Sequence, residues 1–251
     1  MTTLDKLFNP AQRKRLSAAI PGRASCRTYT GAPSTADWAS LAYAAERYRL
    51  PGARLALCRV EEAMFTGTLL GMGRITGCTA AAAIIASSSE PLSRLHAGVL
   101  GEAFALEAAS LGLGTCWVSG AYRKRMLEVP LTDNEAVLCI IAVGIPAPGS
   151  IQPSARKRKP IERIVSNYDR WSATFRDVAL AVQAAPSAMN LQPWQLSLDG
   201  RRFMLDGSDR SQLDLGIALC HAELTLPPHG PWQFNHGGKR GEPFCWTDVN
   251  P

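Results

Sequence analysis

Two arginines flank a serine near the start of the chain, and this pattern is suited to binding phosphate. In "GRASCRTY", Arg23, Ser25 and Arg27 alternate, so an extended backbone would point all three side chains to the same side. Guanidinium groups offer planar, paired donors that match phosphate oxygens, and the hydroxyl adds another donor. A solvated stretch of alternating charge is the other interpretation of these residues.

Two more segments carry groups that could face a ligand. In "ARKRKP", Arg156 and Arg158 again stand two residues apart, although a solvated charge run on a linker would have the same composition. The segment "SLGLGTCWVSG" ends a helix at glycine. The short segment that follows could place backbone N–H groups or the Ser119 hydroxyl beside a ligand, or it could continue as an ordinary buried strand.

The loop "APSAMNLQPWQL" is stiff and rich in hydrogen-bonding groups. Pro186 and Pro193 restrict its backbone, while Ser187, Asn190 and Gln192 supply donors and acceptors. The alternative is a hairpin-like loop that only follows a helix.

Around these segments, the chain alternates helical and strand patterns. Pro10 after Asn9 predicts a helix start, and Asp199-Gly200 between two apolar runs predicts a hairpin. Apolar periodicity predicts helices at about 10–20, 35–50, 92–111, 169–185 and 211–224, and strands at about 53–60, 78–89, 135–146, 194–199 and 202–207. The fold class expected is therefore α+β.

The order of elements repeats along the chain. Residues 41–60 match the outline of residues 180–199: a helix, a loop with a proline, then a strand. Residues 101–117 correspond in the same way to residues 214–232. We interpret this as a divergent internal repeat of two α+β units, which would let one chain imitate a two-fold dimer.

Taken together, these motifs identify a family resemblance. The combination of RxSxRxY, APSAxNxQPW, GLGTCW, a strand ending "AVGIP" and "RKRKP" resembles the FMN-dependent nitroreductase family from about Arg23 to about His221. Members of that family form intertwined dimers with FMN bound at the subunit interface. The resemblance implies a nitroreductase-like fold with mixed or antiparallel sheets flanked by helices.

The resemblance also implies roles for particular residues. Arg23, Arg27, Arg156 and Arg158 would hold the FMN phosphate. The backbone from Trp117 to Gly120 would lie near the reactive N5 of the flavin. Ser25, Ser187 and Asn190 would fix the phosphate end or the ring edge, within a cofactor-binding loop that also includes Pro186, Ala188 and Gln192. No residue is expected to act as a catalytic acid or base, because the flavin supplies the chemistry.

The motif order departs from that of most family members. In those, the PSxxNxQPW loop follows RxSxRxY closely, whereas here "ERYRLPGARL" occupies that place and the intact loop comes in the second half. We therefore expect a single-chain pseudo-dimer, with residues 1–160 as the first half and 161–251 as the second. One complete FMN site would remain.

Composition limits the other classes of function. The net charge of +6 is modest, and the arginines are not interleaved with aromatic residues, so a nucleic-acid partner is not expected. The N-terminus shows no signal peptide, the longest apolar run is far below the roughly 20 residues of a membrane span, and the seven cysteines show no CxxC spacing. The four histidines lack metal-site spacing, so no metal is expected. The scattered cysteines indicate buried reduced thiols and hence a cytoplasmic protein. The pseudo-dimer is expected to be a monomer or a weak homodimer and to have no membrane partner.

The function expected is electron transfer. FMN, with NADH or NADPH as donor, would reduce a small acceptor such as a nitroaromatic or a quinone in a two-step exchange. A non-catalytic FMN-binding protein, such as a flavin sensor or store, is the alternative.

Overall fold

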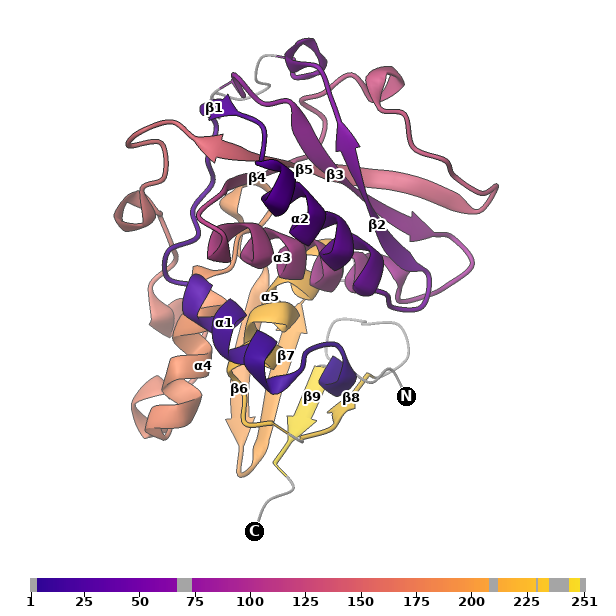
Figure 1. Cartoon of the computed structure of the whole chain (residues 1–251). Helices are drawn as coiled ribbons and strands as arrows, with labels where there is room; N and C mark the ends of the chain where they lie inside the picture. The colour runs from indigo at the N-terminus through magenta and orange to yellow at the C-terminus, as the bar shows by residue number, and fades with distance from the viewer. Residues whose placement is uncertain (1–3, 67–73, 208–211, 229, 235–243, 249–251) are drawn as a thin grey trace.

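Five α-helices and two antiparallel sheets make up the described part of the chain (Figure 1). This structure is a computed structural model and describes residues 4–66, 74–207, 212–228, 230–234 and 244–248. The α-helices are α1 (Pro10–Ala19), α2 (Thr35–Arg47), α3 (Ser93–Ser110), α4 (Ala173–Ala184) and α5 (Gln212–Thr225). Short 3-10 helices lie at Leu4–Lys6, Glu62–Met64, Lys124–Met126, Pro153–Ala155, Ile161–Arg163, Tyr168–Arg170 and Ala188–Asn190.

The two sheets follow the same path. The first contains β1 (Tyr29–Gly31), β2 (Ala53–Arg59), β3 (Ala80–Ser87), β4 (Gly114–Val118) and β5 (Glu135–Pro146). The second contains β6 (Trp194–Asp199), β7 (Arg202–Gly207), β8 (Trp232–Gln233) and β9 (Phe244–Thr247). Leaving β1 aside, the neighbours run β2-β3-β5-β4 in the first sheet and β6-β7-β9-β8 in the second. The internal duplication expected from the sequence stays our proposal, and this shared strand order supports it.

Local sequence explains where several elements begin and turn. Asn9 caps α1 and forms a capping box with Gln12, while Pro10 occupies the first turn, where its missing N–H costs nothing. Ser34 caps α2 through the Asp37 backbone N–H. Gly200 turns the β6–β7 hairpin with a φ of +56°, a conformation that glycine adopts without strain.

Helices α3 and α5 cross between the two sheets and form the centre of the core (Figure 1). At the crossing, a Cβ added to Gly98 would lie 2.1 Å from the Leu213 carbonyl oxygen, and one added to Gly216 would lie 2.0 Å from the Leu95 carbonyl oxygen. Each glycine thus contacts the carbonyl three residues before the other glycine. Reciprocal contacts of this kind are characteristic of a two-fold interface.

Most expected elements are present, with three additions. Strand β1 follows the RxSxR segment, and β8 and β9 lie in a tail for which the sequence predicts no strands. None of the seven cysteines, all within the described residues, forms a disulfide. Among the described residues, no helix is both long and apolar enough to cross a bilayer. The cytoplasmic location stays a prediction.

Candidate functional site

Arg23 points into the protein from the segment that links α1 to β1. This segment runs beside β4, with the Cys26 backbone N–H donating to the Thr115 carbonyl at 2.8 Å. The Arg23 side chain is 2% exposed, and its Nε lies 3.3 Å from Oε1 of Glu102 on α3. The first arginine of the RxSxR pattern is therefore buried, which excludes a solvated charge stretch at this position.

Glu102 connects Arg23 to both halves of the chain. Its carboxylate is fully buried: Oε2 accepts a hydrogen bond from Nε1 of Trp117 on β4, and Oε1 is hydrogen-bonded to Nε2 of His221 on α5, each at 2.9 Å. Burial alone would raise the pKa of this carboxyl, but the Arg23 charge and the two hydrogen bonds outweigh it and hold that pKa below its usual value. These neighbours therefore favour the ionised form of Glu102 at the centre of the molecule.

Ser25 and Arg27 lie half-buried beside the same strand. Burial raises the pKa of the Cys116 thiol, although the charges of Arg27 and Arg23 and a hydrogen bond from Ser25 act in the opposite direction. All three residues of the RxSxR pattern therefore lie close to Cys116, in the middle of β4.

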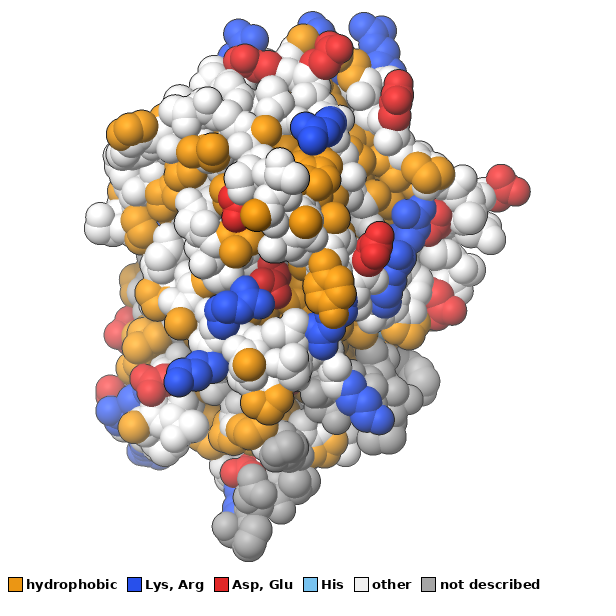
Figure 2. Space-filling view, viewed as in Figure 1, with side chains coloured by type: hydrophobic (Ala, Val, Ile, Leu, Met, Phe, Trp, Pro, Cys, Tyr) orange, Lys and Arg blue, Asp and Glu red, His pale blue; other side chains and the backbone are white. Residues whose placement is uncertain are grey.

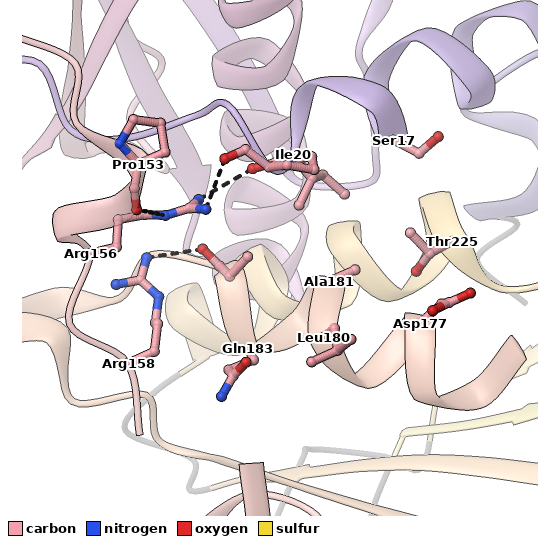
Figure 3. Close-up of a pocket in the computed structure, with 12 residues that line it drawn as sticks. Ser17, Ile20, Pro153, Arg156, Arg158, Asp177, Leu180, Ala181, Gln183 and Thr225 are labelled. Atoms are coloured by element: carbon pink, nitrogen blue, oxygen red, sulfur yellow. Dashed lines mark hydrogen bonds between the residues drawn. The ribbon is translucent and has the colours of Figure 1, made fainter. Parts of the chain in front are cut away.

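Arg156 and Arg158 each hold the C-terminal end of a different helix (Figure 3). Arg156 donates to the carbonyls of Ile20 and Pro21 at the end of α1, and also to those of Arg23 and Pro153. Arg158 donates to the carbonyl of Ala184, the last residue of α4, at 2.9 Å. A cation at a helix C-terminus is favoured by the free carbonyls and the helix dipole. The basic run is therefore part of the fold, with one arginine serving each half.

The loop after α4 is hydrogen-bonded to this basic run. Asn190 accepts from Nη1 of Arg158 at 3.1 Å and donates to the Lys157 carbonyl at 2.9 Å. Gln192 is buried, and its Oε1 accepts from the Lys159 backbone N–H at 2.8 Å. Ser187 Oγ accepts the Gln192 backbone N–H at 2.8 Å. The bonds of Asn190 and Gln192 to the basic run join residues 32 or 33 positions apart in the sequence.

The loop is strained as well as tightly bonded. Met189, Asn190 and Gln192 have φ values of +49°, +56° and +45°. Left-handed backbone costs a non-glycine residue of order 1–3 kcal/mol and is found most often at binding sites and switches. Asp214 in the first turn of α5 supports the loop by accepting the Ala188 backbone N–H at 2.8 Å. Pro186 is buried, whereas Ala188, Met189 and Asn190 are exposed at the tip.

The remaining predicted residues lie at the end of β4. Trp117 is half-buried with its indole toward α3, and Val118 is buried in its pair with Ile140. Ser119 and Gly120 are exposed just beyond the strand, where Gly120 has a φ of +82°. Up to Val118 the segment is thus the largely buried strand given as the alternative, and a role of this backbone beside a ligand stays a prediction.

The guanidinium groups of Arg23, Arg156 and Arg158 lie in one region, with the Glu102 carboxylate beside Arg23. Burial lowers the pKa of Arg158 to about 10, and the charges of Arg23 and Arg156 contribute in the same direction. Burial and the Arg23 charge likewise lower the pKa of Arg156. Nη1 and Nε of Arg23 and Nε of Arg158 are buried without a hydrogen-bond partner among the described residues. Buried donors of this kind are rare in native proteins and indicate a place for an anion.

A pocket of about 530 Å³ opens beside the arginine pair, between α1 and α4. Figure 3 shows Arg156 and Arg158 at one end and Ser17, Asp177 and Thr225 toward the other, with Leu180 and Ala181 between them. Its volume is typical of small-molecule sites. Of the predicted cofactor residues, Arg156 and Arg158 line it, whereas Arg23, Ser187 and Asn190 are not part of its lining.

Several functional residues were not predicted from the sequence. Glu102, His221 and Asp214 reach the site from α3 and α5, and the signal that could have found them is an ionisable side chain within a largely apolar helix. Among the described residues, no group of three or more His, Cys, Asp or Glu side chains could hold a metal ion, and His229 and His236 lie outside the described residues. On the face in Figure 2, Lys and Arg side chains are interspersed with acidic and hydrophobic ones.

The family comparison agrees with the motifs. A family model described as "Putative TM nitroreductase" matches residues 15–226, which is most of the chain. The chain belongs to this nitroreductase family. No curated protein gives a significant match to it.

Solved structures show the fold of this nitroreductase. A structure described as a "putative nitroreductase" from Thermotoga maritima is 23% identical, covers 94% of each chain and has a TM-score of 0.63. An "FMN-dependent Nitroreductase" from Clostridium difficile is 20% identical and covers 61% of this chain and 96% of its own, with a TM-score of 0.43. A "putative nitroreductase in complex with fmn" from Desulfovibrio desulfuricans is 19% identical, with 62% and 95% coverage and a TM-score of 0.43. The first of these covers nearly the whole chain, and the nitroreductase-like fold predicted from the sequence is thereby confirmed.

Proposed function

We propose that this nitroreductase binds one FMN per chain and passes electrons from NADH or NADPH to a small acceptor such as a nitroaromatic or a quinone. The observation that carries the proposal is the cluster of Arg23, Arg156 and Arg158, in which Nη1 of Arg23 and Nε of Arg158 are buried without a hydrogen-bond partner among the described residues. A phosphate would supply both the negative charge and the acceptor atoms that this cluster requires. FMN offers such a phosphate, so the residues present fit the cofactor.

The roles proposed for the chain are binding and orientation. Arg23 and Arg158 have donors left for a phosphate, whereas Arg156 already gives four hydrogen bonds to backbone carbonyls. An arginine side chain has five N–H donors, so Arg156 contributes mainly charge. Asn190 is held by the basic run, at the entrance to this cluster. When bound, FMN accepts and donates hydride, which is why the site needs no acid or base of its own.

One site per chain follows from the placement of the motifs. The RxSxR segment and the basic run belong to residues 1–160, and the PSAxNxQPW loop belongs to residues 161–251. The bond between Arg158 and Asn190 shows that these parts meet. The corresponding loop of the first half, between α2 and β2, has a buried Tyr48 bonded to Glu107 in place of exposed amides.

Absorbance spectroscopy tests the proposal directly. Purified protein loaded with FMN should retain about one flavin per chain and lose its visible absorbance when NADH or NADPH is added without air. Air or a quinone should then restore the colour. Retention of flavin without reduction by either donor would favour the non-catalytic flavin-binding alternative. Failure to bind FMN at all would refute the proposal.

A further inference from the structure

We propose that Glu102 is a positioning residue that aims the guanidinium of Arg23 at the cofactor phosphate. This inference rests on the proposed function and extends it to a residue outside every motif in the sequence. Glu102 lies in the middle of α3, fully buried, with its carboxylate between the RxSxR segment and α5.

Three side-chain nitrogens converge on this carboxylate. Nε of Arg23 is 3.3 Å from Oε1, Nε2 of His221 is 2.9 Å from the same oxygen, and Nε1 of Trp117 is 2.9 Å from Oε2. An ionised carboxylate accepts the Trp117 hydrogen bond and supplies the negative charge that the buried Arg23 guanidinium requires. A glutamine there would turn an NH₂ group toward at least one of the three nitrogens.

The contact with Glu102 determines where the rest of the Arg23 side chain points. Nε of Arg23 makes this contact as an ion pair, without a hydrogen bond among the described residues. A guanidinium is planar, so keeping Nε beside Glu102 restricts the direction of the two terminal nitrogens. Arg156 also holds the Arg23 carbonyl at 2.7 Å, which fixes the backbone end of the same residue. Nη1 of Arg23 is then left buried without a partner among the described residues. That nitrogen is the donor we assign to phosphate.

A purely structural role would make a different prediction. The Glu102–His221 bond joins α3 to α5, so Glu102 could serve only to hold the helices together. The chain contains a matched control for this possibility. Glu223 on α5 is also buried, accepts Nε1 of Trp232 at 2.7 Å and pairs with Arg13 of α1. Trp232 lies on β8, which holds the place in its sheet that β4 holds in the other.

The test compares FMN with riboflavin, which lacks the phosphate. Dissociation constants for both are measured by quenching of flavin fluorescence in the wild type, Glu102→Gln and Glu223→Gln. We expect the wild type to prefer FMN strongly. Glu102→Gln should weaken FMN binding by about tenfold or more, in the range for a lost charged hydrogen bond, and leave riboflavin binding within about threefold. Glu223→Gln should reduce stability to urea but keep the wild-type preference for FMN.

The possible results distinguish the positioning role of Glu102 from the proposed function. An unchanged preference for FMN in Glu102→Gln would overturn the positioning role and leave the proposed function standing. Equal losses of FMN and riboflavin binding would also overturn it, because they would indicate general destabilisation. A wild-type protein that binds neither flavin would refute the proposed function and the positioning role together.

A second variant carries the test if Glu102→Gln does not fold cooperatively. Arg23→Lys keeps the positive charge but lacks the planar fork that Glu102 holds. It should lose most of the preference for FMN over riboflavin. A wild-type preference in Arg23→Lys would overturn the proposal. Where both variants fold, adding Glu102→Gln to Arg23→Lys should cause little further loss, because Glu102 acts through Arg23.

Discussion

Alanine at either glycine of the α3–α5 crossing should destabilise the protein by about 2 kcal/mol. The new Cβ at Gly98 would lie 2.1 Å from the Leu213 carbonyl oxygen, about 1.3 Å closer than ordinary contact. The obstacle is backbone, so no rotamer change can relieve it and the helices must separate. Overpacking of this kind costs up to about 3 kcal/mol, and alanine returns about 1 kcal/mol through its better helix propensity.

The assay is urea unfolding followed by circular dichroism. With a slope of about 2–3 kcal/mol/M, Gly98→Ala and Gly216→Ala should each lower the midpoint by about 0.7–1 M. Because one separation of the helices relieves both contacts, the double variant should lose clearly less than the sum of the two single losses. Gly22→Ala is the control, since its nearest neighbour, the Ala19 carbonyl oxygen, lies at an ordinary 3.8 Å. Unchanged midpoints in both single variants, or full additivity, would refute the reciprocal contact.

Three further predictions concern single side chains. Arg158→Ala should weaken FMN binding by about 1.5–3 kcal/mol, whereas Lys157→Ala, at the neighbouring exposed position, should have little effect. If both variants retain flavin equally well, Arg158 does not bind the FMN phosphate. The hydrogen bond from Arg54 lowers the pKa of Glu135 to about 2. The stabilisation that this ion pair gives to the folded protein should therefore be complete above about pH 4.5 and be lost as the pH falls toward 2. In Glu135→Gln, the free energy of unfolding should not show this loss over the same pH range. Cys58 is the least buried cysteine, so it should be the first to react with a thiol reagent in the native protein and give a fast phase of the reaction. Cys58→Ser should remove this fast phase. If the fast phase persists in that variant, another thiol is exposed.

Elements with strong local signals were predictable from the sequence. Asn9-Pro10 and Asp199-Gly200 predict a helix start and a hairpin from a few neighbouring residues, and the structure has these elements at those positions. Strands β8 and β9 have no such signal, because the tail residues pair only when β7 offers them an edge. Tertiary context decides such segments.

Some residues of the candidate site could likewise be predicted from the sequence, and others could not. The resemblance supplied Arg23, Arg158 and Asn190, which the structure connects through Glu102 and the basic run. It gave no indication that Arg156 and Arg158 also hold helix ends, because those carbonyls belong to residues far away in sequence. Glu102 looked like one polar residue among many apolar ones. Only its distance from three side-chain nitrogens distinguishes it.

In the single-chain pseudo-dimer that we propose, the covalent link between the two halves has a consequence for dilute solution. In a site shared by separate subunits, dissociation on dilution separates the loop from its arginines, so ligand affinity depends on protein concentration. Here Arg158 and Asn190 belong to one polypeptide, and their encounter is intramolecular. The affinity of this site for its ligand should therefore be the same at nanomolar and micromolar protein. A cell could keep very few copies of this protein without losing the site to mass action.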